Sequence, residues 1–386
     1  MTGMFARRLP RGVIGGADVH LLYRSLLGRE PEPAEVSAQL AATRDWWVLL
    51  SAITASEEFR NGRPTAAVPR KDVPVNVWHP DLARWTTAPG TWSDDREAVM
   101  GRDGFTFLAE GTNSVAAQYS STRRLPDDWS GRWAEVVAAR RDDAAALGAV
   151  LSTLIVPDKF SVLRDALPEE ITLESEPPAR LLVDEHAIGY PVRELAAVPE
   201  GAYLRTDTHL SFEGNAALSR WVLRDLGVDE AACDAATALG DEVHEYLSSG
   251  DLGSRFSPPV VEVMRTYSSW GAATIAEENV PALEAAGRHV GTRRVLRNAQ
   301  APDDRAVVVF GDSYAFPQPH YHGIVWYLAQ HFREAHFVWV PFGWDGDYVR
   351  EVGASVVVCE TAERFVPRPP EVRVTVAELE AEALGG

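Results

Sequence analysis

The sequence VVVFGDSY, at residues 307–314, combines a strand with a tight turn. Its run of β-branched and aromatic residues has the length and composition of a buried strand. Gly311 permits a sharp turn after that strand, which would leave the hydroxyl of Ser313 accessible. At the carboxyl end of a strand in an open α/β sheet, such a serine lies where ligands bind. The alternative is that Asp312 and Ser313 only cap the turn.

Similar apolar runs recur on both sides of this stretch and alternate with helical patterns. Strands are predicted at residues 105–108, 150–156, 306–310, 337–340 and 356–359, and long helices at 129–147, 216–226 and 323–332. Continuous apolar strands separated by amphipathic helices predict an α/β fold with a mainly parallel sheet that helices flank on both faces. Residues 230–298 interrupt the alternation and are predicted to form a helical insertion or cap.

The chain divides into three parts by pattern. Residues 1–62 show helical spacing and form a predicted accessory module, residues 63–97 a Pro-rich linker, and residues 98–375 the α/β domain. The first part contains LYR at 22–24, LLGR at 26–29 and SEEF at 56–59, and it resembles a small helical bacterial module of unknown function. That resemblance implies protein docking; a helical cap packed on the main domain is the alternative.

Composition limits the classes of partner. The 386 residues include 37 Lys and Arg against 56 Asp and Glu, a net charge of −19, which argues against nucleic acid as a partner. The apolar runs are far shorter than the ~20 residues of a membrane span. Two cysteines are too few for a disulfide framework or a thiolate zinc site. The N-terminus lacks the apolar stretch of a secretory signal, so we expect a cytoplasmic protein.

A second polar motif, Asp207-Thr208-His209, contains a candidate base for the serine. A serine hydroxyl is a weak nucleophile at neutral pH and needs a base, most often histidine. The histidine in turn needs an acceptor that fixes its tautomer and orientation, which a nearby aspartate provides. Asp207 could therefore hold His209 while His209 reaches Ser313. A surface turn or half of a metal site is the alternative for the Asp-x-His motif alone.

Together these motifs resemble the circularly permuted branch of the SGNH hydrolase superfamily that includes the alginate O-acetyltransferases. Further matching segments lie in the family's order: GRDGFTFL at 101–108, Asn113, Gln118-Tyr119, VPDK at 156–159, GDL at 250–252 and Glu360 with ERF at 363–365. The resemblance implies an SGNH/flavodoxin-like fold with Ser313 as nucleophile, His209 as base and Asp207 as its orienting partner. The family's aromatic residue after the histidine is replaced by Leu210.

The resemblance further implies transfer of an acetyl group to, or its removal from, a carbohydrate hydroxyl. We therefore expect an acyl donor as co-substrate, a carbohydrate or glycosylated small molecule as acceptor, and no bound cofactor. An acetylesterase with the same triad, and a non-catalytic carbohydrate-binding or scaffold protein that keeps the fold, remain open.

Other residues are candidates for the oxyanion hole and the substrate pocket. The Ser313 N–H is the first expected oxyanion donor, and Asn113 is the second, with a turn residue as its alternative. Possible substrate-binding residues are Asp312, Tyr314, His320, His322 and Trp344. We interpret His320 and His322 as pocket residues and predict no metal site, because no cysteine or acidic cluster accompanies them at ligand spacing.

Overall fold

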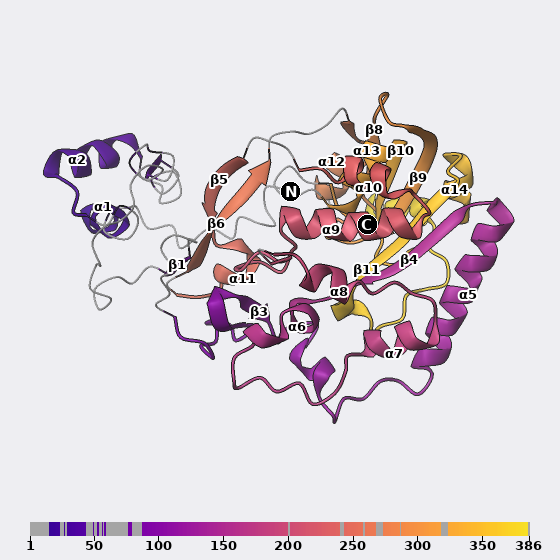
Figure 1. The fold of residues 1–386 in the computed structure, drawn as a ribbon, viewed down its shortest axis with the longest axis horizontal. Coiled ribbons are helices and arrows are strands. Elements are labelled where there is room, and N and C mark those ends of the chain that lie inside the picture. The colour runs from indigo at the N-terminus through magenta and orange to yellow at the C-terminus, as the bar shows by residue number, and fades with distance from the viewer. Residues whose placement is uncertain are drawn as a thin grey trace.

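The computed structural model describes two N-terminal helices and most of the α/β region (Figure 1). The described residues are 15–23, 27, 29–43, 49, 52–53, 56, 58, 76–78, 87–199, 201–239, 243–257, 259–267, 273–285, 287–317 and 323–384. Most of the predicted linker, residues 63–75 and 79–86, lies outside them. His320 and His322 lie outside them as well.

A six-stranded sheet with the order β4-β11-β9-β10-β8-β7 forms the centre of the α/β region. Its strands are β4 (Val150–Val156), β11 (Val356–Ala362), β9 (Asp303–Gly311), β10 (Phe332–Trp339), β8 (Arg293–Arg297) and β7 (Thr274–Glu277). The first four run parallel, whereas β8 and β7 extend the sheet in antiparallel pairing. The predicted fold class, a mainly parallel sheet flanked by helices, is confirmed.

Both faces of the sheet are buried because successive side chains of a strand point to opposite sides. On β9, Val307 and Val309 belong to one apolar core, whereas Val308 and Phe310 belong to the other. Helices α9 (Phe212–Asp225) and α13 (Ile324–His331) supply side chains to the first core. Helices α5 (Trp129–Leu147) and α14 (Gly346–Glu351) supply side chains to the second. This explains the uninterrupted apolar runs of the central strands.

Shorter elements lie beside the sheet (Figure 1). They include the hairpin β2 (Ala98–Met100) and β3 (Thr106–Leu108), and the helices α6 (Lys159–Val162), α7 (Pro178–Glu185), α8 (Val192–Ala196) and α15 (Val376–Leu384). Among the described residues, no helix is both long enough and apolar enough to cross a bilayer.

Residues 230–298 differ from the helical insertion predicted for them. They contain the helices α10 (Glu230–Ala236), α11 (Gly250–Gly253) and α12 (Val280–Ala285), but also β7, β8 and the strands β5 (Val243–Ser248) and β6 (Val260–Tyr267). Strands β5 and β6 join β1 (Asn76–Trp78) in a separate sheet with the order β1-β6-β5. The helical prediction is wrong here because short apolar runs fit either structure, and the strand partners lie elsewhere in the chain.

The N-terminal region contains α1 (Gly16–Leu22) and α2 (Pro33–Ala42), as the helical spacing predicts. The amide of Gln39 donates to the hydroxyl of Tyr23 across this pair. Arg29 in the connection forms an ion pair with Glu35 at 2.8 Å. The role of this region as an accessory module remains a prediction.

Candidate functional site

The serine turn lies where strand β9 ends, as the sequence predicts. Gly311 is the last residue of β9, and Asp312 and Ser313 follow it directly. A Cβ atom on Gly311 would lie 2.5 Å from Oε2 of Glu360, which is closer than real side chains approach. The absence of a side chain at this position therefore allows β9 and β11 to hold the turn tightly between them.

Asp312 fastens this turn to the neighbouring strand. Its carboxylate accepts the N–H of Tyr314 at 3.0 Å and the N–H of Ala362, in β11, at 2.7 Å. The N–H of Asp312 itself donates to Glu360 at 2.9 Å. Asp312 borders the cavity described below, but both of its oxygens are occupied by backbone donors. These bonds position Ser313, and the substrate contact expected of Asp312, which lines the cavity, stays a prediction.

The Asp-x-His motif forms a buried pair. Nδ1 of His209 lies 2.6 Å from Oδ1 of Asp207, which also accepts the backbone N–H of His209 at 3.0 Å. The second oxygen of Asp207 accepts the N–H of Asp251. These bonds direct Nδ1 toward the carboxylate, so Nε2 is the ring atom available for chemistry.

Burial and the attraction between Asp207 and His209 have opposite effects on the pKa values of the two residues. Burial alone would raise the pKa of Asp207, but attraction to His209 and hydrogen bonds from it outweigh that effect and hold the pKa at about 2. For His209, burial favours the neutral ring, whereas the Asp207 carboxylate favours the protonated ring. The carboxylate prevails, and the pKa of His209 lies above its usual value.

Asp251 holds Thr208, which lies between Asp207 and His209, in place. Sequence reasoning did not assign this role to Asp251. Its carboxylate accepts both the N–H of Thr208, at 2.7 Å, and the hydroxyl of Thr208. Gly250 before it has a φ of 56°, and a Cβ atom there would lie 2.3 Å from the carbonyl oxygen of Thr206. The GDL segment was the available signal, because its glycine allows the close approach of the two loops.

Tyr314 connects the serine turn to the histidine loop. Its hydroxyl donates to the carbonyl oxygen of Thr208 at 2.8 Å and accepts from Nη1 of Arg364 at 3.2 Å. The same Nη1 donates to Asp158 at 2.9 Å. Burial raises the pKa of Tyr314, so its hydroxyl stays protonated. Because Tyr314 is buried and does not line the cavity, the predicted substrate contact is replaced by a positioning role.

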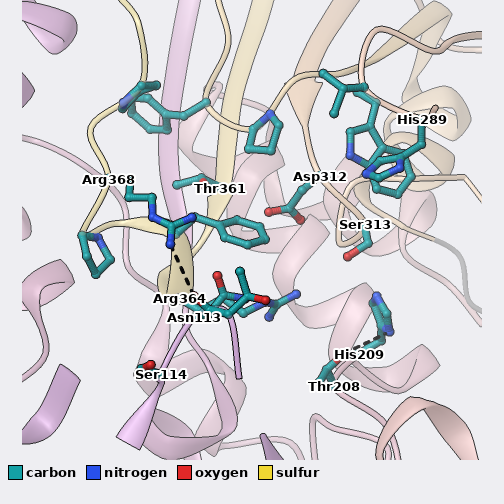
Figure 2. Close-up of a pocket in the computed structure, with 18 of the residues that line it drawn as sticks. Asn113, Ser114, Thr208, His209, His289, Asp312, Ser313, Thr361, Arg364 and Arg368 are labelled. Carbon is teal, nitrogen blue, oxygen red and sulfur yellow. Dashed lines mark hydrogen bonds between the residues drawn. The ribbon is translucent and has the colours of Figure 1, made fainter. Parts of the chain in front are cut away.

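A cavity of about 720 Å³ opens beside these residues (Figure 2). Ser313, His209 and Asn113 all line it. Figure 2 shows Ser313 and His209 toward one side of the cavity, and Asn113, Arg364 and Arg368 toward the other. Its volume lies within the range of sites that hold small organic ligands.

The contact between nucleophile and base is not closed in this structure. Within the described part of the chain, Ser313 forms no hydrogen bond to His209, although both residues face the same cavity. In unliganded enzymes such bonds are often long and tighten only in the reacting complex. The N–H of Ser313 also has no acceptor among the described residues, as an oxyanion donor requires.

Trp344 does not reach the cavity, and its predicted sugar contact is wrong. It is 1 % exposed and packs in the core between the sheet, α5 and α14. Its Nε1 donates to Asp143 of α5 at 3.0 Å. Trp133 and Trp339 line the cavity instead. The loop position of Trp344 in the sequence could not show which way its ring would turn.

Asp207, His209 and Asp251 also offer ligand atoms within 4.8 Å of one another, a spacing that suits a metal ion. However, Asp207 is engaged by His209, and Asp251 is engaged by two donors of Thr208. Coordination would require these donors to be given up. The arrangement favours an oriented imidazole over a metal centre.

A buried hydrogen-bond network around Glu363 supports the site, and sequence reasoning did not identify it. Glu363 accepts the hydroxyl of Tyr119 at 2.7 Å, the hydroxyl of Ser161 at 2.9 Å and the N–H of Asp158 at 2.8 Å. Burial raises the pKa of Glu363 to about 7. Through Asp158 this network holds Arg364, and through Arg364 it reaches Tyr314.

Comparison with known proteins finds no matching protein-family model and no matching curated protein. Solved structures with a similar chain course include the O-acetyltransferase domain of Pseudomonas putida AlgJ, at 18% identity and a TM-score of 0.42 over 74% of this chain and 98% of that one. A DHHW family protein from Eubacterium siraeum is 14% identical, with a TM-score of 0.46 over 75% of this chain and 94% of that one. Bacillus cereus PatB1 is 13% identical, with a TM-score of 0.40 over 63% and 92%. At these values no activity is carried over to this chain, and the proposal below depends on its own residues.

Proposed function

We propose that the protein is a serine-dependent acyl-transfer enzyme that forms an acyl-enzyme on Ser313. The observation that carries this proposal is the buried Asp207–His209 pair, at 2.6 Å, on the same cavity as the serine at the end of β9. A hydroxyl, an oriented imidazole and a buried carboxylate are the groups that acyl transfer through serine requires.

In the proposed first step, His209 takes the proton of the Ser313 hydroxyl as its oxygen attacks the carbonyl carbon of an acyl donor. The negative charge that develops on the carbonyl oxygen is stabilised by the N–H of Ser313 and by the side-chain amide of Asn113. The bond to the leaving group then breaks, and protonated His209 returns the proton to that group. Asp207 stabilises the imidazolium throughout.

In the second step, a hydroxyl of the acceptor loses its proton to His209 and attacks the acyl-enzyme. The ester of Ser313 then breaks, and the serine oxygen regains the proton from His209. Consistent with the family that the motifs resemble, we propose an acetyl group as the acyl unit and a carbohydrate hydroxyl as the acceptor. If water is the second nucleophile, the same residues form an acetylesterase.

Replacing the nucleophile tests the chemistry. Ser313→Ala should abolish hydrolysis of 4-nitrophenyl acetate and leave the thermal unfolding midpoint unchanged within a few degrees. Ser130→Ala is a matched control, because Ser130 in α5 does not line the cavity and its hydroxyl bonds to Glu185. Turnover in Ser313→Ala equal to an active wild type would refute Ser313 as the nucleophile. Wild-type turnover no faster than the uncatalysed reaction would favour a non-catalytic binding protein.

Mass spectrometry separates the two reaction classes. The protein is incubated with a labelled acetyl ester and a panel of sugars, and products are measured against the Ser313→Ala variant. Acetylated sugar supports the transferase. Labelled acetate without acetylated sugar supports the esterase.

A further inference from the structure

Arg368 brings a positive charge to the wall of the candidate site. It lies past β11, lines the cavity and is exposed to solvent. Its Nη2 donates to the backbone carbonyl oxygen of Thr112 at 3.3 Å, a long bond to a neutral acceptor. Figure 2 shows Arg368 on the side of the cavity that lies away from Ser313 and His209.

The other charged residues lining the cavity are engaged by groups of the protein. Arg364 is paired with Asp158 at 2.9 Å. Asp312 accepts two backbone N–H groups, and Asp251 accepts two donors of Thr208. Of the two arginines that line the cavity among the described residues, Arg364 is therefore paired with a carboxylate, whereas the hydrogen-bond partner of Arg368 is a neutral carbonyl group.

His289 on the same cavity does not add a second positive charge. Its ring packs against Trp339 with centroids 4.9 Å apart. Burial lowers the pKa of His289, so the ring is neutral at pH 7. A cation at this place also stands out against the net charge of −19, which repels anions from the protein as a whole.

An apolar wall lies next to this charge. Phe365, Pro367 and Pro370 are partly exposed and line the cavity, whereas the rings of Trp133 and Phe342, which also border it, are 1 % exposed and pack edge to face with centroids 5.1 Å apart. The Nε1 of Trp133 donates to the carbonyl oxygen of Val366, the residue before Pro367, which ties this segment to α5. Such a wall suits a ring or a short hydrocarbon segment.

From this juxtaposition we infer that the substrate carries an anionic group, a carboxylate or a phosphate, that binds Arg368, and an apolar segment that packs against Phe365, Pro367 and Pro370. The inference deepens the proposed function, on which it rests, because it assigns these features to the part of the ester substrate that is not the acyl group. Arginine offers a planar pair of donors that matches both anions.

Kinetics on the full-length protein test the anionic group. The kcat/KM values of 4-acetoxybenzoate and 4-acetoxyphenyl phosphate are compared with that of neutral phenyl acetate. We expect about a tenfold preference for the anionic esters, the size expected of one charged hydrogen bond. Arg368→Gln should remove the preference and leave phenyl acetate unaffected, whereas Arg368→Lys should retain part of it. The anion with the larger Arg368-dependent gain identifies the class.

Arg350→Gln provides the matched control, since Arg350 is an exposed arginine that pairs with Asp347 away from the cavity. It should keep the full preference. An equal loss on anionic and neutral esters in Arg368→Gln would overturn the inference, because it would indicate a merely structural role.

Binding to the inactive Ser313→Ala protein separates the subsite from catalysis. By calorimetry, phenyl phosphate should bind more tightly than methyl phosphate, and adding Arg368→Gln should weaken phenyl phosphate about tenfold. Equal affinities for the two phosphates would refute the apolar part, and no effect of Arg368→Gln would refute the anionic part. If no ester is hydrolysed but binding depends on Arg368, the subsite stands and the proposed function fails.

Discussion

The hydroxyl of Tyr314 donates to the carbonyl oxygen of Thr208 at 2.8 Å, although the two residues are 106 positions apart in the chain. Tyr314 follows the candidate nucleophile Ser313, and Thr208 lies between Asp207 and His209. One hydrogen bond therefore joins the serine turn to the histidine loop. Arg364 also donates to this hydroxyl. The position of the Tyr314 hydroxyl therefore depends on the buried ion pair that Arg364 forms with Asp158.

Tyr314→Phe should lower kcat for 4-nitrophenyl acetate by between about 10- and 100-fold, because a small displacement of the base relative to the nucleophile is costly. KM should change little, since Tyr314 does not line the cavity. The free energy of unfolding should fall by about 1–2 kcal/mol from the lost hydrogen bond. Steady-state kinetics and urea unfolding measure the two effects.

Tyr327→Phe is the control for that variant, because Tyr327 is also buried and its hydroxyl donates to the carbonyl oxygen of Phe212 in α9. It should lose stability and keep its kcat. If Tyr314→Phe likewise loses stability and keeps its kcat, the hydrogen bond between Tyr314 and Thr208 only stabilises the fold.

Asp207→Asn should change both the rate and its pH dependence. As a base, His209 must be neutral, so kcat/KM of the wild type should rise with pH through the raised pKa of His209. Without the carboxylate that pKa falls, and the rise should move to lower pH. The plateau value of kcat/KM should drop on the order of 10³-fold or more, because the amide that replaces the carboxylate would not hold the His209 ring in its productive tautomer.

Rates with 4-nitrophenyl acetate between pH 5 and 9 measure this shift. Asp304→Asn, at an exposed residue paired with Arg333, should reproduce the wild-type profile. An unchanged profile in Asp207→Asn would remove His209 and Asp207 from the mechanism.

Glu363→Gln should flatten the dependence of stability on pH. The pKa of this buried carboxyl is raised from 4.5 to about 7, so between these values the folded state holds a proton that the unfolded state has lost. The stabilisation is complete below about pH 4.5 and is lost as pH rises through 7. Relative to Glu363→Gln, the free energy of unfolding of the wild type should therefore fall by on the order of 2 kcal/mol between pH 5 and 8.

Urea unfolding at each pH measures that difference. Glu110→Gln, at an exposed position, should run parallel to the wild type. If the curves of wild type and Glu363→Gln are parallel as well, Glu363 is not the titrating group.

Local sequence was sufficient for the sheet and for the two motifs at its edge. The runs around Val309 and Val358 are uniformly apolar because both faces of their strands are buried, and this pattern predicts central parallel strands directly. Gly311 predicted the turn because glycine permits a sharp backbone turn, and the structure adds that a Cβ atom there would lie 2.5 Å from Oε2 of Glu360. The pairing of Asp207 with His209 also followed from the sequence, since residues two apart on one loop are within reach.

The direction in which other side chains turn was decided by partners far away in the chain. Trp344 lies in a loop after a strand, yet its ring is buried and bonds to Asp143. Tyr314 follows the same strand as Ser313, but its ring is buried and its hydroxyl bonds to Thr208.

The sequence by itself thus determined the α/β sheet, the serine turn and the Asp207–His209 pair, because these depend on neighbouring residues and on a repeating apolar pattern. Only the tertiary structure decided that Asp251 clamps Thr208, that Glu363 and Arg364 support the site, and that Arg368 borders the same cavity. Each of these depends on contacts between distant segments. Such contacts follow from how the elements pack, and no local spacing in the chain encodes them.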